Sequence, residues 1–178
     1  MLHAKPKKKI LVIDDETMVR EVIAEHLKME NFDVDLAANS SQALDLFQKT
    51  RYDLITIDLR MPQMDGSKLH FVLSKGFGYG QRVSDLIPQR LPPVLVITGN
   101  AKDNAIQGLL AGENVAGILE KPVRHDELIE AVLSILSACD LRRTSHEKVL
   151  KFLGSRVRSR QVARPSAIRD GPFGMDSE

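Results

Sequence analysis

The sequence has one cysteine, Cys139, and no tryptophan, and aromatic residues make up only 4% of its 178 residues. A single cysteine cannot form an intramolecular disulfide, so nothing in the composition requires an oxidising compartment. Because clustered cysteines and paired histidines are also missing, a zinc site is disfavoured. We expect Cys139 to be an ordinary helix residue.

Long hydrophobic runs are absent as well. The first residues, MLHAKPKKKILVIDD, are basic, but their apolar run covers only residues 10–13. Such a run is too short for a signal peptide and far too short to cross a bilayer. The expectation is a cytoplasmic protein without membrane contact.

Charge is close to balanced over the whole chain, with a formal net charge of +1, but it is unevenly distributed. Residues 1–139 carry 16 Lys and Arg against 19 Asp and Glu, whereas residues 140–178 carry 9 against 5. A content of 43% hydrophobic and 28% charged residues is typical of a soluble globular protein. We therefore expect one domain over residues 7–138 and a basic tail over residues 139–178 with a different role.

Short apolar runs recur in the expected domain, each bounded by polar residues. They cover residues 10–13, 34–38, 54–57, 94–98 and 116–120. The first, third and fourth are continuously apolar, as parallel strands covered on both faces must be. Segments with helical periodicity lie around residues 18–27, 43–47, 66 onward, 105–110 and 128–136. This alternation predicts an α/β fold with a parallel sheet and helices on both faces.

Three details of the chain refine this prediction. Ser40 and Ser41 are possible N-caps of the second helix, and Gly112 is a plausible end of the fourth. A stretch around residues 75–92, rich in Gly and Pro, exceeds what a helix and a loop need, and we expect a solvated insertion there. Its GFGYG segment follows a predicted helix and lacks the ending of a phosphate-binding loop.

The basic tail has two expected parts. Apolar residues at helical spacing could form a short amphipathic helix, namely Val149, Leu150, Leu153 and Val157. Beyond Gln161 we expect disorder. The tail shows no DNA-binding motif, so contact with nucleic acid is not expected. A dimerisation helix remains an alternative to a solvated or partner-docking extension.

Polar residues follow the predicted strands at their carboxyl ends, where open α/β sheets bind ligands. Asp14 and Asp15 follow the first strand, Asp58 the third and Lys121 the fifth, and Thr98 ends the fourth. Three neighbouring carboxylates require a proton or a cation, and oxygen ligands suit Mg²⁺. Lys121 and Thr98 would add a positive charge and a hydroxyl donor, which suits a phosphoryl group.

Four motifs at these positions resemble the receiver domains of two-component response regulators. They are IDD at 13–15, ITIDLRMPQMDG at 55–66, VITGN at 96–100 and LEKP at 119–122. The resemblance covers roughly residues 7–138, and within the family these motifs are similar to those of stand-alone chemotaxis-type receivers. It implies a flavodoxin-like, doubly wound sheet of five parallel strands in the order 2-1-3-4-5.

The resemblance also implies roles for the site residues. Asp58 would accept a phosphoryl group from a histidine kinase or a histidine phosphotransfer protein, and Thr98 and Lys121 would contact its oxygens. The cofactor would be Mg²⁺, with Asp14 acting mainly through metal-bound water. The expected metal-binding groups are Asp14, Asp15, Asp58 and the backbone carbonyl of Arg60. The Lys121–Pro122 bond would be cis.

Some residues depart from the family pattern or have no assigned role. Ile118 stands where receivers usually carry Tyr or Phe, so we expect intact phosphotransfer with an altered route of output. Arg60 and Asn100 occupy positions that influence phosphate lifetime in the family. Glu16 is expected to be a solvated acid or a helix cap, and no histidine has an evident partner.

The expected function is a signalling phosphoacceptor, not an enzyme, that acts on a downstream protein, with a homodimer as one option for its assembly. Two alternatives stay open. One is a receiver-like scaffold that is never phosphorylated. The other is an aspartyl-phosphate hydrolase of the haloacid dehalogenase type, which would need its nucleophile after the first strand and a second acid two positions later.

Overall fold

The computed structural model describes residues 6–75, 91–99 and 114–158, with side chains described as far as Arg142 and at Thr144. The chain divides into two compact units, Met1–Asp140 and Leu141–Glu178. The fourth predicted helix, most of the expected insertion, Asn100 and the chain beyond Gln161 lie outside the described residues.

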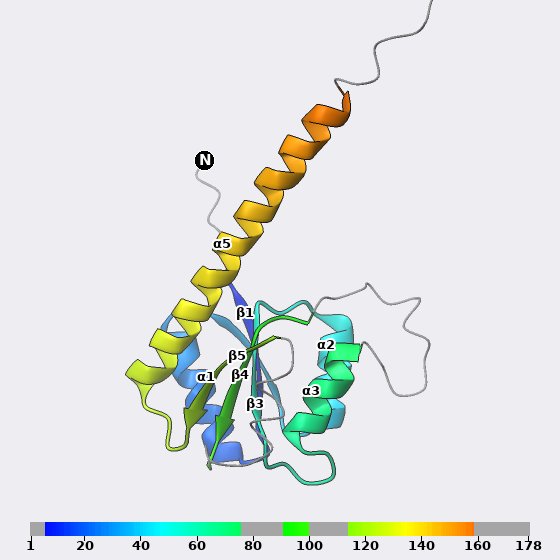
Figure 1. Ribbon diagram of the computed structural model, residues 1–178. Helices are drawn as coiled ribbons and strands as arrows, with labels where there is room; N and C mark the ends of the chain where they lie inside the picture. Colours follow the sequence, from blue (N-terminus) through cyan, green and yellow to red (C-terminus); the bar gives the residue numbers. More distant parts are fainter. Residues whose placement is uncertain (1–5, 76–90, 100–113, 159–178) are drawn as a thin grey trace, which may run out of the picture. The chain divides into compact units, whose positions relative to one another are not determined.

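The first unit is built around a five-stranded parallel sheet (Figure 1). Its strands are β1 (Lys9–Ile13), β2 (Asp33–Ala37), β3 (Leu54–Asp58), β4 (Val94–Thr98) and β5 (Val115–Glu120). Their order is β2-β1-β3-β4-β5, with every neighbouring pair parallel. The predicted flavodoxin-like order is therefore confirmed.

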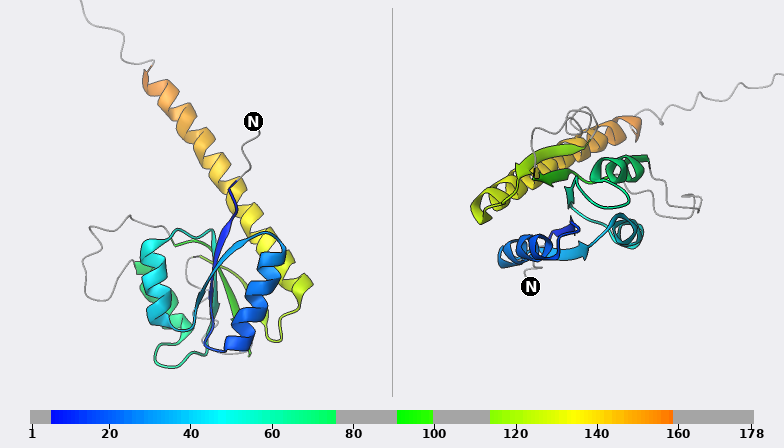
Figure 2. Two further views of the ribbon diagram at one scale, coloured as in Figure 1. Left: turned by 180° about the vertical axis from the view of Figure 1, so that it is seen from behind. Right: turned by 90° about the horizontal axis from the view of Figure 1, so that it is seen from below.

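Helices cover both faces of this sheet, as Figure 2 shows. Helix α1 (Thr17–Met29) and the part of α5 (His125–Arg158) that belongs to the first unit lie on one face. Helices α2 (Ser40–Lys49) and α3 (Gly66–Lys75) lie on the other. Among the described helices, none is long and apolar enough to cross a membrane.

The core consists of two apolar layers, one on each face of the sheet. Successive strand residues point to opposite faces, so one strand supplies both layers. Leu11 and Ile13 pack in the layer with α2 and α3, whereas Ile10 and Val12 pack in the layer with α1 and α5. All four are at most 1% exposed. The continuous apolar runs of the central strands follow from this burial on both faces.

Helix α2 begins differently from the prediction. Its N-cap is Asn39, whose side-chain oxygen accepts a hydrogen bond of 2.9 Å from the backbone N–H of Gln42. Ser40 and Ser41 are the first two helical residues, so their prediction as caps is wrong. Asn is as good a cap as Ser, and the backbone of Asn39 is extended, as a cap requires.

Helix α5 is longer than the sequence periodicity indicates. The fifth predicted helix and the short amphipathic helix of the tail form one helix of 34 residues. The chain contains no Gly or Pro between Pro122 and Gly154, so no residue interrupts the backbone hydrogen bonding. The change in charge after Cys139 marks a change in composition and not a helix end.

Two histidines without a predicted partner meet between α1 and α5. The rings of His26 and His125 pack edge to face, with centroids 4.8 Å apart. The Nε2 atom of His125 lies 3.6 Å from a carboxylate oxygen of Glu30. Because the contact joins segments about a hundred positions apart, local sequence patterns do not reveal it.

The cap of α3 gives a prediction that depends on pH. Asp65 precedes the helix, and its carboxylate accepts hydrogen bonds from Ser67 and from the backbone N–H of Lys68. Partial burial raises the pKa of Asp65, but these hydrogen bonds outweigh it and hold the pKa below the ordinary 3.8. Replacing Asp65 by Ala should lower the free energy of unfolding by about 1 kcal/mol near neutral pH.

The part of this loss that depends on the Asp65 charge should disappear in acid. A carboxyl group with a lowered folded pKa stabilises the fold above its unfolded pKa, and the stabilisation is lost as the pH falls through the folded value. Urea unfolding at neutral pH and below about pH 4 would measure the change. The matched control is Asn39→Ala, which removes an uncharged cap, so its loss should not change with pH. A pH-independent loss for both variants would contradict the prediction.

Candidate functional site

The candidate site lies beyond the carboxyl ends of β1, β3, β4 and β5. After β1 ends, the N–H of Asp14 still bonds to the carbonyl of Ala37 at 3.2 Å, and the chain then turns into α1. Asp58 and Thr98 are the last residues of β3 and β4. Lys121 follows β5, and its backbone N–H donates to the carbonyl of Thr98 at 2.8 Å.

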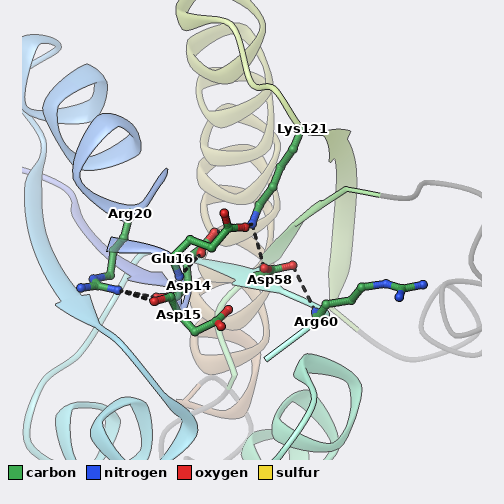
Figure 3. A network of polar contacts seen from close by, with 7 residues as sticks. All are labelled: Asp14, Asp15, Glu16, Arg20, Asp58, Arg60 and Lys121. Atoms are coloured by element: carbon green, nitrogen blue, oxygen red, sulfur yellow. Dashed lines mark hydrogen bonds and ion pairs between the residues drawn. The ribbon is translucent and has the colours of Figure 1, made fainter. Parts of the chain in front are cut away.

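Lys121 contacts three carboxylates, two from the turn after β1 and one from the end of β3 (Figure 3). Its Nζ lies 2.7 Å from Asp58 Oδ2, 2.9 Å from Asp14 Oδ2 and 3.1 Å from Glu16 Oε1. The side chains of Asp14 and Asp58 are only 2% and 3% exposed, and that of Lys121 is 13% exposed. The structure therefore brings Asp14, Asp58 and Lys121 together in a site shielded from water. The Lys121–Pro122 bond is cis, as the resemblance implies.

Both carboxylate oxygens of Asp58 accept hydrogen bonds, which fix the orientation of the side chain. Oδ2 accepts a hydrogen bond from Lys121, and Oδ1 accepts one of 3.2 Å from the backbone N–H of Arg60. The exposed Arg60 side chain extends away from the carboxylates in Figure 3. The use of the Arg60 carbonyl as a metal ligand stays a prediction.

Glu16 belongs to the acidic group, although sequence reasoning left it outside the site. Carboxylate oxygens of Asp14, Glu16 and Asp58 lie within 4.8 Å of one another. Glu16 is the N-cap residue of α1 by position, but its side chain makes no capping hydrogen bond and pairs with Lys121 instead. Its side chain is 62% exposed, so the prediction of a solvated acid holds only in part. In the sequence, the position of Glu16 directly after Asp14 and Asp15 could have indicated that it belongs to the site.

Asp15 Oδ1 is a buried carboxylate oxygen with no hydrogen-bond partner within the described residues, whereas Asp14 Oδ2 lies 2.9 Å from the Lys121 ammonium. Unpartnered buried carboxylate oxygens are unfavourable unless a cation is bound. The donor set is oxygen only, which fits a hard divalent cation such as Mg²⁺. Asp15 is not among the three acids whose oxygens already cluster, so its role as a ligand stays a prediction.

The pKa values of Asp14 and Lys121 reflect the close approach of several carboxylates. Burial raises the pKa of Asp14, as does the charge of Asp58, while Lys121 and the N–H of Glu16 act in the opposite direction. Burial lowers the pKa of Lys121, but its contacts with Asp58 and Asp14 outweigh burial and raise the pKa above 10.5. Lys121 is therefore an ammonium throughout the neutral range. One ammonium serves several acids, so the site favours additional positive charge.

Thr98 and Ile118 occupy neighbouring strands near this edge. Thr98 is fully buried, one residue beyond Ile97, which pairs with Asp58 in register. Ile118 of β5 is half-buried and packs against the core layer that contains Ile57. Thr98 thus lies at the same end of the sheet as Asp58, while contact of its hydroxyl with a phosphoryl group remains a prediction.

Comparisons with known proteins agree with this arrangement. The family model described as response regulator receiver domain matches residues 10–133. Response regulator MprA of Mycobacterium tuberculosis is 31% identical over 149 residues, which cover 83% of this chain and 56% of MprA. An NtrX-like response regulator of Rickettsia conorii is 28% identical over 143 residues, which cover 79% of this chain and 27% of that protein.

Solved structures show the same fold. The receiver domain of Francisella response regulator 1452 is 29% identical, with a TM-score of 0.58, and the match covers 75% of this chain and 99% of that domain. The first relatives are longer proteins, and the chain spans between about a quarter and about half of their length. Over residues 10–133, this chain belongs to the receiver domain family of two-component response regulators.

Proposed function

We propose that Asp58 accepts a phosphoryl group from the phosphohistidine of a histidine kinase or a histidine phosphotransfer protein, in a reaction that requires Mg²⁺. The observation that carries the proposal is the placement of Asp58. Its carboxylate is buried at the end of a central strand and held 2.7 Å from Lys121 Nζ, beside other acids.

The chemistry is a phosphoryl transfer from nitrogen to oxygen. One carboxylate oxygen of Asp58 attacks phosphorus in line with the leaving imidazole nitrogen. The phosphorus–nitrogen bond breaks, its electron pair returns to the imidazole, and that nitrogen takes up a proton. The product is an acyl phosphate on Asp58 and a free histidine on the donor. No oxidation or reduction is involved.

Residues of the chain position the transferred group. Lys121, now paired with Asp58, would move its ammonium contact to a phosphoryl oxygen as negative charge leaves the carboxylate. Thr98 would donate its hydroxyl to another oxygen from the neighbouring strand. Asp14, Asp15 and Asp58 would hold Mg²⁺ together with the carbonyl of Arg60. When bound, Mg²⁺ would offset the charge of the phosphoryl oxygens and the surrounding acids.

Output is proposed to run through contacts with a downstream protein. Phosphorylation adds about two negative charges at Asp58. A ligand shifts a conformational balance only by its different affinity for the two states. Because Ile118 provides an aliphatic side chain where the family usually carries an aromatic ring, the shift here would use other contacts around β4 and β5.

Incubation of the full chain with acetyl phosphate and Mg²⁺ tests the proposal. The intact mass of the protein should rise by one phosphoryl group, and Asp58→Asn should gain none because its amide is not a nucleophile. Chelation of Mg²⁺ should suppress the adduct. Asp65→Asn is the matched control, since it removes an acid from the loop that follows Asp58 but lies outside the site, and it should be phosphorylated like the unmodified sequence.

The possible outcomes separate the alternatives. If Asp58→Asn still acquires the phosphoryl group, the assignment of Asp58 is wrong. Absence of any adduct at saturating Mg²⁺ would favour an unphosphorylated scaffold. Release of many phosphates per protein molecule without a lasting adduct would favour a hydrolase.

A further inference from the structure

Arg20 makes contacts that the function proposed above leaves unexplained. It lies in the first turns of α1 and is half-buried. Its Nη1 donates to the backbone carbonyl of Asp14 at 2.7 Å and reaches the carbonyl of Asp15 at 3.4 Å. Its Nη2 donates to the hydroxyl of Thr17 at 3.3 Å. One guanidinium therefore joins both ends of the turn that carries the first acids of the site (Figure 3).

The backbone of this turn requires a contact that keeps it in its observed conformation. Neighbouring strand residues point to opposite faces, so Asp14 and Asp15 could both face Asp58 only if the chain turns at this point. The Glu16 N–H is bonded to Asp14 Oδ1 at 2.9 Å, which fixes that side chain but not the carbonyls. Repulsion among the clustered carboxylates favours a wider turn, because widening it separates like charges.

Arg20 and Lys121 stabilise the acidic group in different ways. Lys121 contacts carboxylate oxygens, the same type of atom that a cation would use. Arg20 contacts backbone carbonyls of the turn, so its contacts remain when a cation binds the carboxylates. The planar guanidinium fork of Arg20 can donate hydrogen bonds to two acceptors at once. A lysine ammonium at the end of a flexible stem does this less well.

We propose that Arg20 is a positioning residue for the divalent cation: it fixes the turn between β1 and α1 so that Asp14 and Asp15 face Asp58. This inference rests on the proposed function, because it concerns the same cation site. In this role Arg20 would contact the backbone of the turn and neither the cation nor the phosphoryl group. It acts through the geometry of the carboxylates, as the outer hydrogen-bond partners of metal ligands do.

Titration of the full chain with Mg²⁺ by calorimetry, and with Mn²⁺ by electron paramagnetic resonance, measures the effect. Arg20→Ala should weaken Mg²⁺ binding by about 10- to 100-fold, the usual result of removing an outer partner of a metal ligand. Arg20→Lys keeps the charge and loses the fork, so it should bind Mg²⁺ more weakly than the unmodified sequence and more tightly than Arg20→Ala. Phosphorylation by acetyl phosphate should slow at low Mg²⁺ and recover at saturating Mg²⁺.

Arg51→Ala is the matched control. Arg51 is exposed and precedes β3 at the end opposite Asp58, so this variant loses the same charge without touching the turn. Its Mg²⁺ affinity should stay within about twofold of the unmodified value, since Coulomb effects of a distant exposed charge are screened. Addition of methylguanidinium should restore part of the Mg²⁺ affinity of Arg20→Ala.

The results distinguish two failures. If the unmodified chain binds neither Mg²⁺ nor Mn²⁺, the proposed function fails. If it binds them and a folded Arg20→Ala binds them equally well, the role of Arg20 is refuted. Should Arg20→Ala not fold, as judged by circular dichroism, Arg20→Lys decides: unmodified affinity refutes the positioning role, and weaker affinity supports it.

Discussion

Replacing Gly66 by alanine should destabilise the protein by about 3 kcal/mol or more, as severe overpacking does. A Cβ atom at this position would overlap the carbonyl oxygen of Asp58, and would lie 2.7 Å from Ile57 Cγ2 and 2.9 Å from the carbonyl carbon of Asp58. Two of these neighbours are backbone atoms of β3, which cannot rotate away. The hydrogen bond of 3.0 Å from Gly66 N–H to the carbonyl of Leu59 holds the two segments close.

The same substitution should affect the site. Relief of the overlap has to move either the start of α3 or the end of β3, and the second movement displaces Asp58 from Lys121. We therefore expect slower phosphorylation by acetyl phosphate even at temperatures where Gly66→Ala is folded. Urea unfolding monitored by circular dichroism measures the stability, and intact mass against time measures the phosphorylation rate.

Two other glycines supply a graded control. An added Cβ at Gly99 meets no atom within 4 Å, so Gly99→Ala should change the free energy of unfolding by no more than about 0.5 kcal/mol. At Gly117 the nearest atom is the end of the flexible Leu95 side chain at 3.2 Å, and the expected loss is intermediate. Equal stabilities of Gly66→Ala and Gly99→Ala would show that the start of α3 does not approach β3 as closely as the structure indicates.

Much of the fold follows from local patterns. The strand runs at residues 10–13, 54–57 and 94–98 were predictable because burial on both faces requires continuous apolar residues. Asp58 and Lys121 were predictable as site residues because the carboxyl ends of parallel strands share one edge of the sheet. The roles assigned to them, in contrast, come from the family resemblance and await the experiments above.

Other features depend on contacts that local patterns do not encode. The approach of Glu16 to Lys121 depends on how the turn after β1 directs its side chains, and a turn has no periodicity from which direction can be read. The pairing of His26 with His125 requires two helices to meet. The need for glycine at position 66 comes from its close approach to Asp58, because added atoms there would collide with backbone.

Lys121→Met should produce the other large effect, a loss of about 3 kcal/mol in the free energy of unfolding without divalent cations. Breaking a buried ion pair by removing one partner typically destabilises a protein by about 3–5 kcal/mol, because the remaining charge stays buried. Met keeps the apolar stem of lysine and removes only the ammonium. Asp14 and Asp58 would then face each other at 2% and 3% exposure without the cation that separates them.

Mg²⁺ should reverse much of this loss, which distinguishes an electrostatic effect from a packing defect. A cation that binds only the folded state stabilises it by about 2.7 kcal/mol at a concentration one hundred times its dissociation constant. In the unmodified chain, the proposed Mg²⁺ site would use the same carboxylates of Asp14 and Asp58 that the Lys121 ammonium contacts, so metal binding would displace existing contacts. Lys121→Met has no such competition, and its stability should rise more steeply with Mg²⁺ concentration.

Urea unfolding in a chelator and in increasing Mg²⁺ measures both quantities for the two proteins. The matched control is Lys68→Met, because Lys68 also pairs with an aspartate, Asp65, but its side chain is 72% exposed. Such a pair contributes about 0–1 kcal/mol, and its loss should not change the response to Mg²⁺. Equal stabilisation of Lys121→Met and the unmodified chain by Mg²⁺ would mean that ammonium and metal occupy separate positions. A Lys121→Met protein more stable than the unmodified chain in chelator would mean that burial of the ammonium costs more than its contacts return.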